Sequence, residues 1–147
     1  TLLVDDLTII DSDNICFYLD SISNKKTLFP KDDYFKIISI VSVANGLMES
    51  VLERRMEIIR PDNEKSKNFI NKQEIRIRRT IKWLEDNWKN YNEDYLTMDQ
   101  ITIACALEYT NFRLNNQWEK YSPNLVNWLN NFRTKDFMRS TIPVEAK

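Results

Sequence analysis

The chain has 147 residues, of which 42% are hydrophobic and 12% aromatic, enough to bury one core of domain size. Its 21 Lys and Arg residues balance 22 Asp and Glu residues, and the formal net charge of -1 provides no field that attracts nucleic acid or an anionic membrane. The longest apolar run, IISIVSVANGLM, is interrupted by Ser and Asn and falls short of a membrane span. We therefore expect neither nucleic acid nor a membrane as a partner.

The residue inventory also excludes several kinds of chemistry. The chain contains no His, so Ser-His-Asp and Cys-His nucleophile systems and zinc sites of the Cys-His type are impossible, and we expect no metal. A single Gly and four Pro residues argue against a strand-rich fold, which needs many turn residues. The two cysteines, Cys16 and Cys105, lie on patterns typical of buried positions, which favours a reduced cytoplasmic compartment over a disulfide scaffold.

The first 30 residues predict a β-hairpin, a helix and a linker. The runs TLLV and LTII are separated only by Asp5 and Asp6, which is typical of a tight hairpin. In the following stretch, DSDNICFYLDSI, either Asp11 or Ser12 is suited to cap a helix. The apolar positions of that helix repeat at helical spacing, at Ile15, Cys16, Leu19 and Ile22. Residues 23–30, SNKKTLFP, break both periods and indicate a linker.

From residue 31 onward the pattern predicts only helices. A helix over residues 32–60 is apolar around most of its circumference, which is typical of a helix buried on two sides. A second helix over residues 68–88 gathers its apolar residues on one face, at Ile70, Ile77, Ile81, Leu84 and Trp88. Its cations lie elsewhere, at Arg76, Arg78, Arg79 and Lys82. Such a cluster is able to bind phosphate, but the acidic residues nearby favour a solvated face.

The stretch YLTMDQITIACALEY carries a strong start signal for another helix. Thr97 is suited to be the N-cap, Gln100 stands at the capping-box position, and apolar residues on both sides form a hydrophobic staple. Beyond this start only Thr102 and Glu108 are polar, so we expect the helix to run through the centre of a bundle. Cys105 is then expected to be a small core residue, with a reactive thiol as the less favoured alternative.

The last predicted helix opens in the stretch YSPNLVNWLNNF. Ser122 is suited to cap it and Pro123 to occupy its first position. Its inward-facing residues are expected to be Leu125, Trp128, Leu129 and Phe132. The stretch TKDFMRSTIP closes the chain with one more short turn of helix. The residues alone thus predict a hairpin and a helix followed by a five-helix domain.

This order of elements is similar to that of the cytosolic glutathione S-transferases. The stretch TLLVDDLTIIDSDNICFYLD resembles the third and fourth strands and the third helix of their thioredoxin-like domain, and LTMDQITIACALEY resembles the capped start of their sixth helix. A bacterial branch of the family is indicated by ANGLMESVLERRMEIIRP, ALEYTNFR and YSPNLVNWLNNFRTKDFMRSTIP. The resemblance covers nearly the whole chain. Two departures are Gln100, where the family usually has Asp, and Asp13, where many members carry Arg or Asn.

The resemblance implies a mainly α fold in two parts. Residues 1–22 correspond to the C-terminal part of the thioredoxin-like domain (hairpin plus helix), residues 23–30 to the linker, and residues 31–147 to the all-α C-terminal domain. A two-stranded hairpin alone is only marginally stable, and the family's first strand, first helix and second strand would precede Thr1. They would carry the Tyr, Ser or Cys that stabilises the glutathione thiolate. The catalytic residue is therefore unknown.

Asp11 and Ser12 match the family's acid-Ser motif, which receives the γ-glutamyl end of glutathione. Ser12 and the first amide groups of a helix suit a carboxylate, and Asp11 suits an ammonium group. Without the resemblance this pair would be an ordinary helix cap. With it, glutathione contact is the favoured interpretation.

The helix over residues 32–60 is expected to face both a cleft and a second subunit. Its polar and semipolar residues could line a cleft for a small hydrophobic electrophile, and these are Asn45, Met48, Glu49 and Leu52. Met48 and Leu52 are equally compatible with a core position. The helix is apolar on more faces than one core requires, which, together with the resemblance to a dimeric family, predicts a homodimer.

The resulting functional hypothesis is a cytoplasmic glutathione transferase, with glutathione as co-substrate, that conjugates or transfers it to a small electrophile in detoxification. The alternative is a non-catalytic member of the fold that serves as a dimerisation or interaction module. Asp11 and Ser12 favour the enzyme, because a purely structural module has little reason to keep them.

Overall fold

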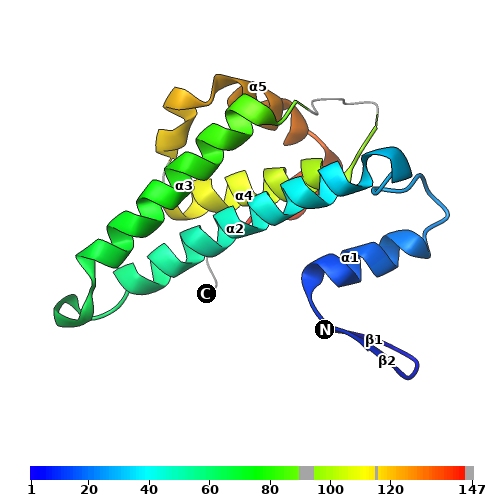
Figure 1. The fold of residues 1–147 in the computed structure, drawn as a ribbon, viewed down its shortest axis with the longest axis horizontal. Helices are drawn as coiled ribbons and strands as arrows, with labels where there is room; N and C mark the ends of the chain where they lie inside the picture. The colour runs from blue at the N-terminus through cyan, green and yellow to red at the C-terminus, as the bar shows by residue number, and fades with distance from the viewer. Residues whose placement is uncertain (90–94, 115, 145–147) are drawn as a thin grey trace.

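The computed structural model describes residues 1–89, 95–114 and 116–144. It consists of a short hairpin followed by helices (Figure 1). The elements are β1 (Leu2–Val4), β2 (Leu7–Ile9), α1 (Ser12–Ser21), α2 (Tyr34–Ile58), α3 (Lys67–Asn87), α4 (Met98–Leu114), α5 (Pro123–Phe132) and α6 (Asp136–Arg139). Short 3-10 turns occupy Lys31–Asp33, Asp62–Glu64 and Asn116–Tyr121.

The hairpin forms as the sequence predicts. Strands β1 and β2 are antiparallel, and Leu2 pairs with Ile9 while Val4 pairs with Leu7. Asp5, in the turn, has a φ of 48°, a left-handed conformation that Asp adopts more readily than most residues. Figure 1 shows the hairpin and α1 to one side of the helical bundle. Leu3 is largely exposed there.

Helix α2 is the central element of the bundle. It packs against α3 and α4, which run alongside it in Figure 1. Its buried residues, among them Val41, Leu47 and Val51, contribute to the core, so the predicted burial on two sides is confirmed. The helix begins at Tyr34, later than predicted, because the preceding residues form a 3-10 turn.

By length and composition, the segment Lys31–Ile58 is also apolar enough to cross a membrane. The prediction that its apolar run is too short for a span was therefore wrong. Core helices of soluble proteins have the same composition, and here the buried apolar residues of α2 are packed where this helix contacts α3 and α4. The contacts are those of a core helix.

Aromatic residues of α5 and of the C-cap of α3 meet at the end of this core. The rings of Trp88 and Trp128 lie edge to face with centroids 4.7 Å apart, and the tilted ring of Phe132 also lies 4.7 Å from that of Trp128. Glu85 of α3 lies beside them and is only 4% exposed. Its carboxylate accepts hydrogen bonds from the amides of Asn124 (3.0 Å) and Leu125 (2.9 Å), so α3 caps the start of α5.

A second, smaller cluster joins α1 to the bundle. Ile37 and Val41 of α2 and Met98 of α4 are buried there, and Cys16 and Phe29 pack against them. The segment before α2 is also attached, because the amide of Met98 donates to the carbonyl of Leu28 at 3.1 Å. Helix α1 is therefore fixed against the N-terminal half of α2 and the start of α4.

Helix α4 corrects the prediction for Cys105. Ile103, Ala104, Ala106 and Leu107 are fully buried, as expected, but Cys105 is exposed. Successive helical residues are turned by about 100°, so one residue in this apolar run lies outside the buried core. The sequence did not reveal which one, because Cys is apolar enough to fit either side.

Candidate functional site

The predicted glutathione contacts lie at the exposed start of α1. Asp11 is the N-cap, and its Oδ1 accepts a hydrogen bond from the amide of Asp13 at 2.9 Å. The carbonyl of Asp11 accepts the first helical bond, from the amide of Ile15 at 3.0 Å. Asp11 has a φ of 78°, and Ser12 is the exposed first residue of the helix. The pair therefore presents a carboxylate, a hydroxyl and a helix N-terminus at one exposed place.

Asn45 of α2 lies next to this helix start. Its Nδ2 donates a hydrogen bond to Oδ2 of Asp13 at 2.8 Å, with both groups partly buried. This bond joins residues 32 positions apart and ties the start of α1 to α2. The structure thus brings Asn45 close to Asp11 and Ser12. Its amide is committed to Asp13, a residue that the sequence analysis treated only as a departure from the family.

The other predicted cleft residues follow along α2 but have different surroundings. Met48 is partly buried and packs against the main core. Glu49 is exposed, and Leu52 is 48% exposed, so the alternative that Leu52 is a core residue was wrong. Met48 also lines a cavity among the described residues.

This cavity has a volume of about 370 Å³ and lies among α2, α4, α6 and the C-terminal segment. Its lining is mostly apolar and includes Met48, Tyr109, Met138 and Ile142. Cys105 also lines it, so the cysteine predicted for the core lies at the wall of a cavity. The contributions of α4 and the C-terminal segment were not predictable from the sequence, because they depend on how distant helices pack.

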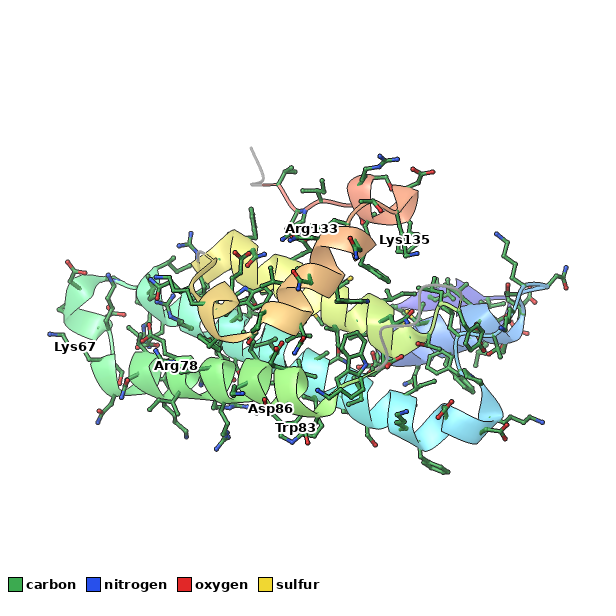
Figure 2. All side chains as sticks on the ribbon, turned by 90° about the horizontal axis from the view of Figure 1, so that it is seen from above. Lys67, Arg78, Trp83, Asp86, Arg133 and Lys135 are labelled. Carbon is green, nitrogen blue, oxygen red and sulfur yellow. The ribbon has the colours of Figure 1, made fainter. Side chains whose placement is uncertain are left out.

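The charged groups at this cavity neutralise each other. Arg133, which follows α5 (Figure 2), donates from Nε to Oε1 of Glu108 at 2.5 Å and from Nη2 to Oε2 at 3.4 Å. A bidentate pair of this kind holds both side chains in place without leaving a net charge. The cavity therefore suits an uncharged apolar group.

The two thiols are poor nucleophiles in this environment. Cys105 is exposed as a residue, but its thiol is partly buried, and this burial raises its pKa. The proximity of Cys16 and Glu108 raises the pKa further. Burial, and then Asp13, also raise the pKa of Cys16. Both thiols stay protonated near neutral pH, which disfavours the reactive-thiol alternative because the thiolate is the nucleophile.

The capped start of α4 is built from residues that are close together in sequence. The amide of Thr97 donates to Oε1 of Gln100 at 3.3 Å, which is one half of a capping box. The Thr97 hydroxyl donates to Oδ1 of Asp99 at 2.5 Å, and Nε1 of Trp88 donates to Oδ2 of the same carboxylate at 2.8 Å. Asp99 was missed in the sequence, yet it links the helix start to the core.

Comparisons with known proteins agree with this architecture. No family model matches the chain. It is 27% identical, over 141 residues, to the uncharacterised GST-like protein YibF of Escherichia coli (strain K12), and the match covers 92% of this chain and 70% of that protein.

Two solved structures share the arrangement. A glutathione transferase family member from Pseudomonas fluorescens Pf-5, with bound S-(propanoic acid)-glutathione, superposes with a TM-score of 0.91 at 26% identity, over 98% of this chain and 76% of that chain. A glutathione S-transferase from Methylobacillus flagellatus KT with glutathione bound has a TM-score of 0.84 at 22% identity, over 92% of this chain and 70% of that one. The second likeness concerns the fold alone.

The predicted fold class is thereby confirmed. The hairpin and α1 correspond to the C-terminal part of a thioredoxin-like domain, and the remaining helices correspond to the helical domain that follows it. The chain is a homologue of a bacterial glutathione-transferase-like protein and has the fold of bacterial glutathione transferase family members.

Proposed function

We propose that the chain forms part of a glutathione-binding, glutathione-transferase-like protein, in which Asp11 and Ser12 hold the γ-glutamyl end of glutathione. The observation that carries the proposal is the exposed start of α1, where the two side chains are adjacent and Asp11 caps the helix. The relative from Pseudomonas fluorescens, which is similar over nearly the whole chain, was solved with a glutathione derivative bound.

The chemistry of this helix start suits an amino-acid end group. One oxygen of Asp11 accepts from the Asp13 amide, and the other is directed to no described donor. That second oxygen is suited to accept from the ammonium group of the γ-glutamyl moiety. The Ser12 hydroxyl and the positive end of α1 are suited to its carboxylate.

We propose transfer of glutathione to a small hydrophobic electrophile as the activity. In this reaction the glutathione sulfur, as thiolate, forms a bond to an electrophilic carbon, and a leaving group departs with its bonding electrons or a double bond takes them up. Asn45, Met48, Glu49 and Leu52 follow one side of α2 beyond the α1 site, and the apolar cavity at Met48 is large enough for a small apolar group. We assign the catalytic role to none of the residues in this chain.

The same proposal includes a homodimer in the cytoplasm and a role in detoxification. In this proposal residues 1–22 are the glutathione-binding part, residues 23–30 are the linker, and residues 31–147 are the helical domain. Apolar side chains are exposed along α2 and α3, including Phe35 at 77%, Met56 and Ile75. Exposed apolar surface on two adjacent helices is suited to cover a second subunit. A non-catalytic dimerisation module is the alternative that this surface alone would support.

Calorimetric titration of the intact protein with glutathione tests the site. Asp11→Asn keeps a good helix cap but removes the charge, and Ser12→Ala removes the hydroxyl. We expect each to weaken glutathione binding by about 1 to 3 kcal/mol, the value of a hydrogen bond to a charged group. Ser21→Ala, the same change at the other exposed end of α1, is the control and should leave the affinity unchanged.

The result also separates the two functional classes. Unchanged affinity in both Asp11→Asn and Ser12→Ala would reject the assignment of the γ-glutamyl contacts. A protein that sediments as a dimer but binds no glutathione would favour the interaction module.

A further inference from the structure

The two cysteines of the chain lie on different helices that meet beside α2, Cys16 on α1 and Cys105 on α4. Cys16 packs against the smaller cluster that joins α1 to the bundle, and Ile101 of α4 packs against the same cluster. Cys105 comes four residues after Ile101, which is about one turn and about 6 Å farther along the same side of α4. The two thiols are close enough for the charge of one to act on the other. The packing of α1 thus pairs two sulfur atoms that are far apart in the sequence.

Neither thiol is taken up by a disulfide, and the pair is open on one side. Cys105 is exposed and lines the apolar cavity of about 370 Å³, which is also lined by the thioether residue Met48. Cys16 is partly buried. A small ion is therefore able to reach Cys105 from solvent or from the cavity, and Cys16 offers it the one other thiol of the chain.

The number of metal ligands at this place is small. The described residues, 1–89, 95–114 and 116–144, contain no group of three or more Cys, Asp or Glu side chains arranged to hold a metal ion. A structural zinc site takes four ligands, and Mg²⁺ and Ca²⁺ prefer oxygen. A pair of thiolates suits a soft ion instead, one that needs only two sulfur ligands. The absence of His excludes sites that combine Cys with His, and that exclusion does not extend to an ion of this kind.

The surroundings of the two thiols favour a divalent ion over a monovalent one. Burial raises the pKa of both thiols, then Cys16 and Glu108 raise the pKa of Cys105, and Asp13 raises that of Cys16. Two thiolates with a monovalent ion carry one net negative charge, which partial burial and the two neighbouring carboxylates disfavour. Two thiolates with a divalent ion form a neutral complex, and neither burial nor the carboxylates oppose it.

We propose that Cys16 and Cys105 together bind one soft divalent cation that takes two sulfur ligands, with the mercuric ion as the probe of this class. Two S–H bonds break, two bonds between sulfur and the ion form, and two protons leave to solvent, so no oxidant or reductant takes part. The bound ion links α1 directly to α4. The site uses neither Asp11 nor Ser12 and does not depend on the proposed glutathione contacts.

Titration of the intact, reduced protein with mercuric chloride tests the pairing. One equivalent should remove both thiols from reaction with a chromogenic disulfide reagent and should release two protons per ion. The mass spectrum should show single chains that carry one mercury each and have lost two protons. A thiol left over after one equivalent, or chains joined in pairs by mercury, would overturn the proposal, because each sulfur would then bind the ion without the other.

Competition with 2-mercaptoethanol, a monothiol that does not resemble glutathione, measures the strength of the chelate. Cys16→Ser and Cys105→Ser should each retain the ion at least about a hundredfold less well than the unmodified protein, because a second ligand fixed on the same fold acts at a high effective concentration. Met56→Leu, which removes an exposed sulfur of α2 outside the pair, is the control and should retain the ion fully. Circular dichroism checks the fold of each variant.

The unmodified protein provides a second test that needs no substitution and does not depend on the folding of a variant. In strong denaturant the same competition should remove the ion, because the long segment between Cys16 and Cys105 no longer holds the two sulfurs together. Equal retention by folded and unfolded chains would overturn the proposal. Retention by either single-thiol variant equal to that of the unmodified protein would do the same.

Discussion

Helices α4 and α5 both begin inside the bundle, but their first amide groups are satisfied by different means. At α4 some of the partners are local, because Thr97, Asp99 and Gln100 bond among themselves within four residues, whereas the Met98 amide donates to the carbonyl of Leu28. At α5 the partner is remote, because Glu85 of α3 accepts from Asn124 and Leu125, 39 and 40 residues away. A sequence pattern is able to reveal the first arrangement, whereas the second depends on the packing of α3 against α5.

The comparison explains why one predicted cap is absent. Ser122 stands at the N-cap position before Pro123, as predicted, but its side chain makes no capping bond. Its Oγ is buried and has no hydrogen-bond partner among the described residues. The Glu85 carboxylate occupies the place where the Ser122 hydroxyl was expected to act, and it also accepts from Nδ2 of Asn124 at 2.7 Å.

The remote cap should be the most sensitive to substitution. Glu85→Ala leaves the buried amide of Leu125, the partly buried amide of Asn124 and one side-chain amide without their acceptor, and we expect a loss of about 3 kcal/mol in the free energy of unfolding. Chemical denaturation followed by circular dichroism measures this loss. Asp86→Ala, an exposed neighbour on the same helix, is the control and should change stability by about 0.5 kcal/mol at most. A Glu85→Ala variant as stable as this control would show that α5 needs no cap from α3.

Substitution at the start of α4 should reduce stability less than Glu85→Ala does, because Thr97, Asp99 and Gln100 all contribute hydrogen bonds there. Thr97→Ala removes the hydroxyl that donates to Asp99 but leaves the Gln100 bond to the backbone amide. We expect a destabilisation of about 1 kcal/mol, and at most about 2 kcal/mol. The denaturant midpoint, compared with that of Thr110→Ala in the middle of the same helix, measures it. A midpoint equal to that of the unmodified protein would make the Thr97 hydroxyl dispensable.

The start of α3 also has a carboxylate partner, that of Glu57, and we expect its contribution to stability to depend on pH. Oε1 of Glu57 accepts from the amide of Ser66, the N-cap of α3, at 2.6 Å. This bond, and then Arg60, lower the pKa of Glu57. A lowered pKa in the folded state contributes stability that is complete above the unfolded pKa and is lost as the pH falls through the folded one.

We therefore expect Glu57→Gln to flatten the acid side of the stability profile and to leave the shape of the profile above neutral pH unchanged. Denaturation midpoints measured from neutral pH down to about pH 3 give this profile, and Glu49→Gln, an exposed residue of α2, is the control. A profile for Glu57→Gln that runs parallel to that of the unmodified protein would contradict the assignment.

The smallest effect is expected where the sequence pattern was misleading. Ser122→Ala removes a buried hydroxyl that has no partner among the described residues, so it should leave stability within about 0.5 kcal/mol or increase it slightly. Measured beside Thr97→Ala, it compares a cap that bonds with one that does not. A loss for Ser122→Ala as large as that for Thr97→Ala would mean that the Ser122 hydroxyl caps α5 after all.

Features encoded within a few residues were predictable from the sequence. The runs TLLV and LTII, separated only by Asp5 and Asp6, gave the hairpin, and the polar start before Ile15 gave the beginning of α1. The apolar circumference of α2 gave its burial on two sides. In each case the signal lies in the periodicity of one segment, which the structure preserves.

Features that join distant segments were not predictable. The side of α4 on which Cys105 lies depends on where α2 and α3 pack, and the bond from Asn45 to Asp13 depends on how α1 docks. The position of Arg78 at a cavity requires the turn Asn116–Tyr121 to close over α3. The resemblance to a known family supplied the fold, but it did not supply these contacts.

The Glu85 cap also bears on the order in which the helices acquire their native form. At the start of α4, Thr97, Asp99 and Gln100 bond with one another within four residues, so this part is able to form before Leu28 and Trp88 join it from other segments. Helix α5 has only ten residues, which is too short to be stable alone in water. Its cap lies 40 residues away and becomes available only when the intervening chain has closed into a loop. In kinetic terms, α5 consolidates with or after the docking of α3, whereas α4 has the local means to nucleate.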